Sequence, residues 1–238
     1  MGDLVTAVAD FLAEPGRWSL SAPMGIPYRV VEHLVATLVS MGIAIAAALP
    51  PAVWLAHHRR AEAIASAVVN IGRAIPSFGL IVVFFLVLNI RWGIDSFWAV
   101  VGALVALAIP PIFTNAYTAV AEVDRATVEA AVGQGMTHRQ VLGRVELPLG
   151  LPVILAGIRI ALVQVIATVG IGAIVTDGGG VGRFVIDGFS VGVRGHGEVV
   201  VGAVLMALLV LVAEGVFGLL HRWVVPAPLR VDPAERRE

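Results

Sequence analysis

The chain has 238 residues, of which 58% are hydrophobic and 14% are charged, and its formal net charge is −1. A soluble domain has roughly 45–50% apolar and about 25% charged residues, so most of this chain is expected to face lipid or other helices. The charge balance gives no reason to expect a nucleic acid partner. The absence of cysteine excludes a disulfide framework and thiol metal ligands.

Residues 1–29 are expected to form an extracytoplasmic segment ahead of the first membrane span. In residues 3–14 the apolar side chains share one helical face and the acidic side chains another. That pattern fits a short helix on the membrane surface, and a frayed tail is the alternative. Prolines and glycines between residues 15 and 27 should end any helix before the first span begins.

Five apolar stretches predict membrane spans, because about 20 residues of α-helix cross the hydrocarbon of a bilayer. We expect helices at residues 30–56, 63–89, 96–120, 150–176 and 198–221. The sequence therefore predicts an all-α membrane protein with one transmembrane domain over residues 30–221. A polar tail follows at residues 222–238.

Three ionic residues lie inside these spans and are candidates for function by their position alone. They are Arg73, Arg159 and Glu214. At a rise of about 1.5 Å per residue, all three lie at similar depth along their helices. We expect a structural ion pair between Glu214 and one of the two arginines, inside the helix bundle.

Arginine placement predicts the orientation, because cytoplasmic loops carry an excess of basic residues. Alternating spans put nine arginines on the side of residues 121–148 and the C-terminus, and five on the opposite side. We therefore expect the N-terminus outside the cell and both the 121–148 loop and the C-terminus in the cytoplasm.

The first half of this loop, from Ala121 to Val132, is rich in residues that favour a helix and can continue the third span into the cytoplasm. Gly133 and Gly135 should end that helix, since glycine tolerates the backbone angles of a sharp reversal. We expect a side chain at Gly135 to be obstructed.

The second half of the loop has the signals of a short separate helix. Thr137 and Gln140 have the spacing of a capping box, and an apolar stripe follows them. Leu147 and Pro148 should stop this helix, because proline lacks the N–H that a helix needs. A short helix held between glycine and proline breaks can transmit rigid-body movement from a partner. An ordinary amphipathic connector is the alternative.

The spacing of Glu129-Ala130-Ala131, Gly135 and Val145-Glu146-Leu147-Pro148 resembles the cytoplasmic signature of bacterial ABC importer permeases. Ile75-Pro76-Ser77, Ile109-Pro110-Pro111, Thr114-Asn115-Ala116-Tyr117-Thr118 and the run 151–159 look like the permeases of osmoprotectant importers. Those systems take up glycine betaine, choline, carnitine or proline. The resemblance covers roughly residues 30–220 and implies the five-helix fold of type I importer permeases, with a cytoplasmic coupling helix.

One segment departs from the family pattern. Thr176-Asp177-Gly178-Gly179-Gly180-Val181-Gly182 stands where a loop similar to Gly-Ala-Gly-Gly-Leu-Gly is expected. A permease for methionine or another amino acid is therefore the alternative substrate assignment. From other classes, a secondary transporter or channel and a membrane scaffold protein also remain, but both leave the 121–148 loop unexplained.

The resemblance implies a complex in the bacterial cytoplasmic membrane. Its partners would be two ABC ATPase subunits, a second permease subunit that is identical or homologous, and an extracytoplasmic substrate-binding protein. The chain contains no lysine and so no Gly-x4-Gly-Lys nucleotide motif. We therefore expect no catalytic residue and no cofactor on this chain, with ATP hydrolysed by the partner. Its histidines lack metal-ligand spacing, and we expect no metal.

Two sets of residues are assigned beyond the ion pair. The set expected to couple to the ATPase is Glu129, Ala130, Ala131, Gly135, Thr137, Gln140, Leu142, Val145, Leu147 and Pro148. The polar residues and helix kink expected along a translocation path are Asn70, Pro76, Asn115, Tyr117, Gln164 and Thr168. Interhelical hydrogen bonding is an equally good interpretation of the polar members of the second set.

Overall fold

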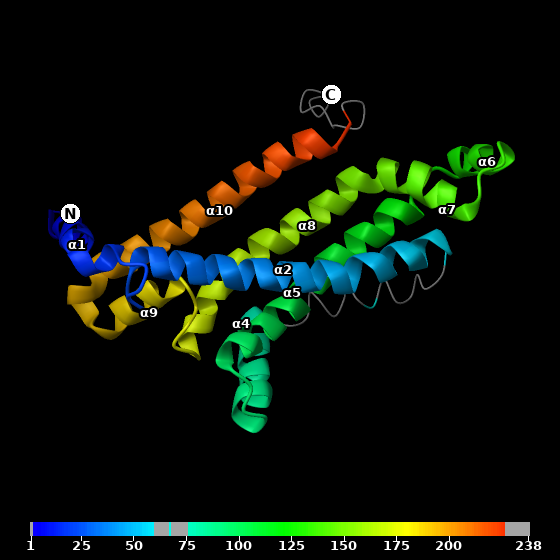
Figure 1. Ribbon diagram of the computed structural model, residues 1–238. Coiled ribbons are helices and arrows are strands. Elements are labelled where there is room, and N and C mark those ends of the chain that lie inside the picture. The colour runs from blue at the N-terminus through cyan, green and yellow to red at the C-terminus, as the bar shows by residue number, and fades with distance from the viewer. Residues whose placement is uncertain (1, 60–66, 68–75, 227–238) are drawn as a thin grey trace. The chain divides into compact units, whose positions relative to one another are not determined.

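A computed structural model of the chain describes residues 2–59, 67 and 76–226 (Figure 1). Those residues form helices joined by short turns, with no strand among them. The elements are α1 (Gly2–Ala13), η1 (Pro15–Trp18), α2 (Ile26–His57), α4 (Ser77–Phe84), η2 (Phe85–Arg91), α5 (Ser96–Ala121), α6 (Arg125–Gly133), α7 (His138–Val141), η3 (Leu142–Glu146), α8 (Leu147–Val169), η4 (Gly170–Ile174), α9 (Gly182–Ser190), η5 (Gly192–Gly195) and α10 (His196–Val224).

Four helical runs in the described part of the chain are long and apolar enough to cross a membrane. They are Ile26–His57, Ser96–Ala121, His138–Ile174 and Gly192–Val224. These runs confirm four of the five expected spans. Much of the remaining span, expected at residues 63–89, lies outside the described residues. Its described end forms the shorter apolar helices α4 and η2, so the fifth span stays a prediction.

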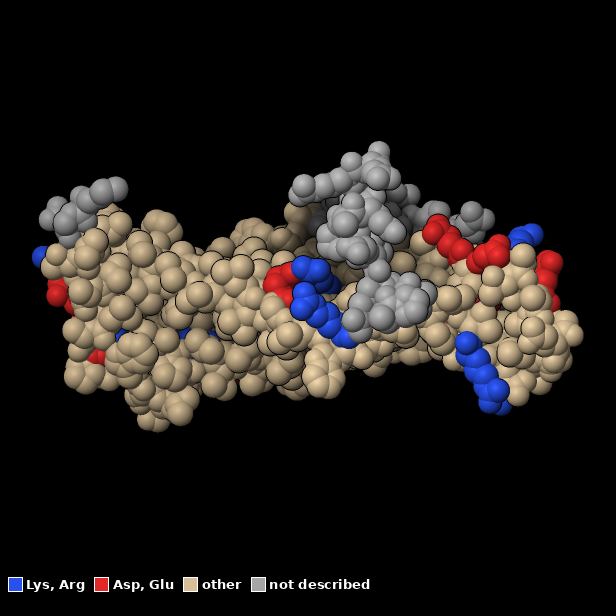
Figure 2. All heavy atoms as spheres, turned by 90° about the horizontal axis from the view of Figure 1, so that it is seen from above, with Lys and Arg blue, Asp and Glu red and all other residues tan. Residues whose placement is uncertain are grey.

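The surface is that expected of a membrane protein. Figure 2 shows one face on which the atoms that are not grey are mostly tan, with a few blue and red patches of charged side chains. The last long helix is an extreme case, since only 11% of its most apolar window is buried within the chain. Large apolar side chains on α10, such as Leu211 and Val216, are exposed and suited to contact with lipid or with another subunit.

The chain divides into two compact units. The first comprises Met1–Ile43, Ile75–Ala108 and Leu162–Ala213, and the second comprises Ala44–Ala74, Ile109–Ala161 and Glu214–Glu238. The second unit holds the last residues of α2, α5 and α10 and the first residues of α8. That grouping is the one expected when consecutive spans α5, α8 and α10 run in alternating directions.

In the first unit the N-terminal helix α1 is part of a protein core. Phe11 packs edge to face against Phe184 of α9, with ring centroids 5.7 Å apart, and both belong to a buried cluster with Ile26, Val181 and Val201. The Arg17 guanidinium lies 4.3 Å from the centre of the Phe11 ring. The expected helix is confirmed and the frayed tail is wrong, whereas its position on the membrane surface stays a prediction. Part of its apolar face is buried with α9 and α10 in this core, although Leu4 is exposed.

In the second unit α5 and α8 approach closely where α8 carries glycine. A Cβ atom at Gly157 would lie 2.5 Å from Cβ of Asn115 and 2.8 Å from the carbonyl oxygen of Pro111. Small residues allow membrane helices to pack at such short range, where van der Waals contact drives their association. The crossing of α5 and α8 therefore depends on the missing side chain at Gly157.

We predict that Gly157→Ala destabilises the protein and Gly215→Ala does not. The added methyl group at Gly157 overpacks the helix crossing, which costs roughly 1–3 kcal/mol. At Gly215, also in a long helix of the second unit, a Cβ would meet no atom within 4 Å. Thermal unfolding of the purified protein in detergent measures both variants. Equal unfolding temperatures for the two variants would contradict the close crossing.

Candidate functional site

The 121–148 loop begins with a break between two helices. α5 ends at Ala121, and α6 starts at Arg125 with Asp124 as its N-cap. The Asp124 carboxylate accepts hydrogen bonds from the Thr127 hydroxyl at 3.1 Å and the Thr127 N–H at 3.2 Å, and these bonds lower the pKa of that carboxyl. The expected uninterrupted helix from Ala121 to Val132 is wrong, because the aspartate cap starts a new helix.

The reversal after α6 depends on one glycine. α6 ends at Gly133, and Gly135 has a φ of +86°, a backbone conformation that side chains with a Cβ disfavour. No atom lies within 4 Å of the position of a Cβ at Gly135. The glycine turn is confirmed, but the expected obstruction of a side chain there is wrong. Gly135 is required for its backbone angle.

The coupling helix α7 starts with the capping box that the sequence predicted. The Thr137 hydroxyl accepts from the Gln140 N–H at 3.4 Å, and the Gln140 side chain accepts from the Thr137 N–H at 2.8 Å. Each side chain satisfies a backbone donor that the first helical turn leaves unpaired. The start of α7 is therefore fixed locally, within the loop itself.

The end of this helix differs from expectation. Leu147 and Pro148 do not stop it, because α7 continues through the π-helical turn Leu142–Glu146 directly into α8. A π turn changes the hydrogen-bond register by one residue, which suits a helix that must pass a proline without an N–H. The loop and the following span therefore form one helical run, His138–Ile174.

A contact between distant residues joins this run to α2. His57 Nδ1 lies 2.5 Å from Glu146 Oε2, and the two side chains are 9% and 6% exposed. His57 is the last residue of α2, and Glu146 is the last residue of the π turn. Sequence reasoning missed this pair, although both residues are polar positions beside predicted spans. Nothing in the sequence indicates that residues so far apart meet.

A hollow of about 460 Å³ lies between α6 and the π turn η3. Among the residues that line it are Asp124, Ala130, Ala131 and Val145, three of which belong to the expected coupling set. Of the remaining expected residues, Glu129, Gly135, Thr137 and Gln140 are exposed, and Leu142, Leu147 and Pro148 are half-buried. The loop thus presents a partly hollow surface with small side chains.

The predicted ion pair forms between Arg159 and Glu214. Arg159 Nε donates to the two carboxylate oxygens of Glu214 at 3.0 and 2.8 Å, and Arg159 Nη2 donates to Oε2. The expected position inside the bundle is wrong, since the Arg159 side chain is 53% exposed and the Glu214 side chain 27% exposed. Arg73, the other expected partner, lies outside the described residues.

The expected path residues fall in different units and make mainly local contacts. Asn115 donates to the Pro111 carbonyl at 2.8 Å, and Thr168 donates to the Gln164 carbonyl at 2.7 Å. Tyr117 stacks on Phe113 of the same helix. Pro76 caps α4, and Asn70 lies outside the described residues. The hydrogen bonds of Asn115 and Thr168 stay within their own helices, so they are not the interhelical bonds of the alternative interpretation. A role in a path stays a prediction.

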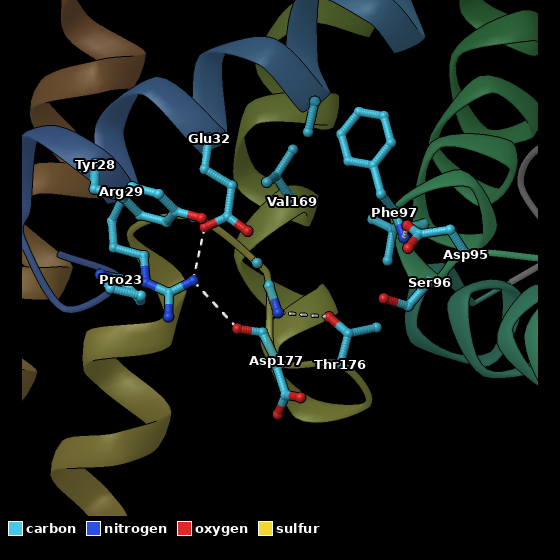
Figure 3. Close-up of a pocket in the computed structure, with 15 residues that line it drawn as sticks. Pro23, Tyr28, Arg29, Glu32, Asp95, Ser96, Phe97, Val169, Thr176 and Asp177 are labelled. Atoms are coloured by element: carbon cyan, nitrogen blue, oxygen red, sulfur yellow. Dashed lines mark hydrogen bonds and ion pairs between the residues drawn. The ribbon is translucent and has the colours of Figure 1, made fainter. Parts of the chain in front are cut away.

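The first unit contains a pocket of about 370 Å³ at the N-terminal ends of α2 and α5 (Figure 3). Figure 3 shows Tyr28, Arg29 and Glu32 on one wall, Asp95 and Phe97 on the other, and the loop after α8 below. That loop is the segment 176–182, which departs from the family pattern. The segment that departs from the family pattern therefore has a structural role, because residues 176–180 form the floor of a charged pocket.

Negative charge dominates this pocket. Glu32, Asp95 and Asp177 line it together with one basic residue, Arg29. Arg29 donates to the Glu32 carboxylate at 2.7 Å and to the Asp177 backbone carbonyl at 3.2 Å, so it holds the loop in place. Arg183 is engaged by Asp187, which raises the pKa of the guanidinium. Among the described residues, the Asp177 carboxylate accepts no hydrogen bond. The pocket therefore suits a positively charged group.

In the described ranges, no group of three or more His, Asp or Glu residues is arranged to hold a metal ion. The candidate site features are the 121–148 loop, the ion pair of α8 and α10, and the acidic pocket of the first unit.

Comparisons with known proteins find similarity to membrane transport permeases. Residues 39–226 match the family described as "Binding-protein-dependent transport system inner membrane component". The glycine betaine/carnitine/choline transport system permease protein OpuCD of Bacillus subtilis (strain 168) is 33% identical over 195 residues, 82% of each chain. The carnitine transport permease protein OpuCD of Listeria monocytogenes serotype 1/2a (strain 10403S) is 31% identical over 202 residues, 85% of this chain and 87% of that protein.

A solved structure shows the same fold. An inward-facing conformation of the MetNI methionine ABC transporter contains a chain that superposes with a TM-score of 0.71 at 27% identity. The match covers 84% of this chain and 96% of that chain. The described helices therefore have the arrangement of an ABC importer permease.

We predict that His57 and Glu146 stabilise the loop as a pair. Glu146→Ala and His57→Ala each leave one buried polar partner unsatisfied, which costs about 3 kcal/mol. The double variant should lose clearly less than the sum of the single losses, because the residues interact directly. Denaturant unfolding measures the free energy of unfolding of the unsubstituted protein, the two single variants and the double variant.

Glu129→Ala is the matched control, since it removes the same group from an exposed position of the same loop. Its stability should equal that of the unsubstituted protein. Additive losses in the double variant would show that the His57–Glu146 contact contributes nothing of its own.

Proposed function

The chain belongs to the family of binding-protein-dependent transport system inner membrane components, and we propose that it is the permease subunit of an ATP-driven importer of osmoprotectants. The substrates would be small quaternary amines of the glycine betaine, choline and carnitine kind. The observation that carries this proposal is the similarity to a glycine betaine/carnitine/choline permease over 82% of both chains.

The 121–148 loop gives the proposal its mechanism. The loop would dock on an ATPase subunit, with the small side chains of Ala130 and Ala131 leaving room for a side chain of that partner. Because α7 continues into α8, movement of the docked loop would pass into a membrane span. The His57–Glu146 contact would carry the same movement to α2. A stiff linkage of this kind supports a change between inward-open and outward-open states driven by closure of the ATPases.

The acidic pocket of the first unit supports a substrate with a positive charge. Its carboxylates attract a cation, and the Phe97 ring that lines it is of a kind that favours a quaternary ammonium group. The Tyr28 ring already contacts the Arg29 guanidinium, 5.7 Å from the ring centre. Importers of methionine remain the second candidate, because the MetNI chain shares the fold. The amino group of methionine also carries a positive charge, so the pocket alone does not decide between the two, and direct competition is the appropriate test.

The assembly that follows contains two permease subunits around one path, two ATPases that bind and hydrolyse ATP, and an extracytoplasmic protein that delivers the substrate. This chain would bind no nucleotide or other cofactor. The loop would lie in the cytoplasm, on the arginine-rich side of the bacterial inner membrane. The pocket of the first unit would then lie at the extracytoplasmic ends of α2 and α5, where the binding protein delivers its cargo.

We predict ATP-dependent uptake of glycine betaine by the complete complex. The complex, purified through a tag on this chain and placed in vesicles with ATP inside and binding protein outside, should accumulate labelled glycine betaine. Choline and carnitine should compete, whereas methionine should not. An ATP analogue that cannot be hydrolysed should abolish uptake and serves as the control.

Two results would overturn this prediction. Uptake of methionine without uptake of glycine betaine would assign the chain to the amino-acid importers. Uptake that persists without ATP would indicate a secondary transporter.

We predict the orientation independently. Reporter fusions after residues 60, 93, 135, 190 and 230 should read inside, outside, inside, outside and inside. The arginine distribution and the alternating helix directions produce this order. Activity of an extracytoplasmic reporter at residue 135 would place the loop outside the cytoplasm and would rule out contact with an ATPase.

A further inference from the structure

The Arg159–Glu214 pair lies near the middle of the membrane. Arg159 is about 18 Å along α8 from Leu147, and Glu214 about 15 Å along α10 from Val224, at 1.5 Å per residue. The hydrocarbon of a bilayer is roughly 30 Å thick. Neither side chain therefore lies within easy reach of the water at the ends of its helix.

At this depth, the pair is exposed on the surface of the single chain. The Arg159 side chain is 53% exposed, and its helix neighbours Ala156 and Ile160 are also exposed. Ionised side chains in a membrane span face the interior of a bundle or a water-filled cavity, because contact with lipid costs several kcal/mol. In the assembled protein, this face of α8 and α10 therefore cannot contact lipid.

The hydrogen bonds of the pair favour water over a dry interface with another subunit. Arg159 uses Nε and Nη2 toward Glu214, and within the described residues Nη1 has no partner. A dry protein interface would leave those N–H groups without acceptors, which is costly for a charged group. A water-filled cavity supplies the missing acceptors.

We propose that the Arg159–Glu214 pair lines the water-filled path through which substrate crosses the membrane. The inference rests on the proposed function, since it assumes that a path is present. The guanidinium and the carboxylate provide a positive and a negative charge at mid-membrane, beside the exposed apolar side chains of Ala156 and Ile160. Glycine betaine and carnitine carry a quaternary ammonium and a carboxylate, so each pole of such a zwitterion meets an opposite charge at this position.

Cysteine labelling tests the proposal directly, because the chain contains no native cysteine. Ala156→Cys lies one turn before Arg159 on the exposed face of α8, and Val216→Cys is an exposed position on another face of α10 from Glu214. In the assembled complex, a charged thiosulfonate reagent should label Ala156→Cys at least ten times faster than Val216→Cys. Ile160→Cys, also exposed, replaces Ala156→Cys should that variant assemble poorly.

Three outcomes would overturn the proposal. Equal labelling at both positions, slow or fast, would show that this face has no special access to water. A disulfide between two copies of Ala156→Cys without labelling would place the pair in a contact between subunits. Uptake of glycine betaine in the same vesicles separates these failures from a failure of the proposed function.

A second measurement distinguishes a hydrated ion pair that lines the path from an ion pair that only holds α8 and α10 together. Glu214→Gln should leave the amount of assembled complex within two-fold of normal, because water solvates the remaining guanidinium. Uptake should fall at least ten-fold, because the path loses the negative charge that attracts the ammonium group. A loss of assembled complex in Glu214→Gln, with restoration by Arg159→Gln in the same chain, would show instead that the pair only holds helices together.

Discussion

A bilayer offers no hydrogen-bond partners, and this constraint shapes the described chain throughout. Every backbone donor and acceptor in the hydrocarbon must be satisfied within the protein, which favours helices over irregular chain. Asn115 and Thr168 follow the same rule when they donate to carbonyls of their own helices. Arg159 and Glu214 hydrogen-bond each other, and the exposure of this charged pair makes it informative about what surrounds it.

Local features of the loop could be predicted from sequence because short-range rules govern them. The capping box of Thr137 and Gln140 needs only a spacing of three residues, and the turn at Gly135 needs only a residue that tolerates positive φ. The break at Asp124 is also local, but its aspartate cap competes with a strongly helical composition. Composition alone predicted an uninterrupted helix from Ala121 to Val132, which is wrong.

Long-range features could not be predicted in the same way. The His57–Glu146 contact joins residues 89 positions apart, and sequence gives no measure of that proximity. The pairing of Glu214 with an arginine was predictable because opposite charges at similar membrane depth attract, but the sequence left Arg73 and Arg159 equally open. The exposure of the pair depends on how α8 is rotated in the bundle. The packing of α1 against Phe184 likewise requires knowing that α9 turns back toward the N-terminus.

The continuity of α7, η3 and α8 links the loop and the ion pair mechanically. The capping box stands at one end of this run and Arg159 further along it, and both belong to the second unit. A continuous helix moves as one rigid body when its end is displaced. It can bend where its hydrogen-bond register changes. The π turn Leu142–Glu146 is such a place, and Glu146 there is held by His57. On the proposed function, that contact would brace the run at this turn, so that movement of the loop would reach Arg159 instead of being absorbed as a bend.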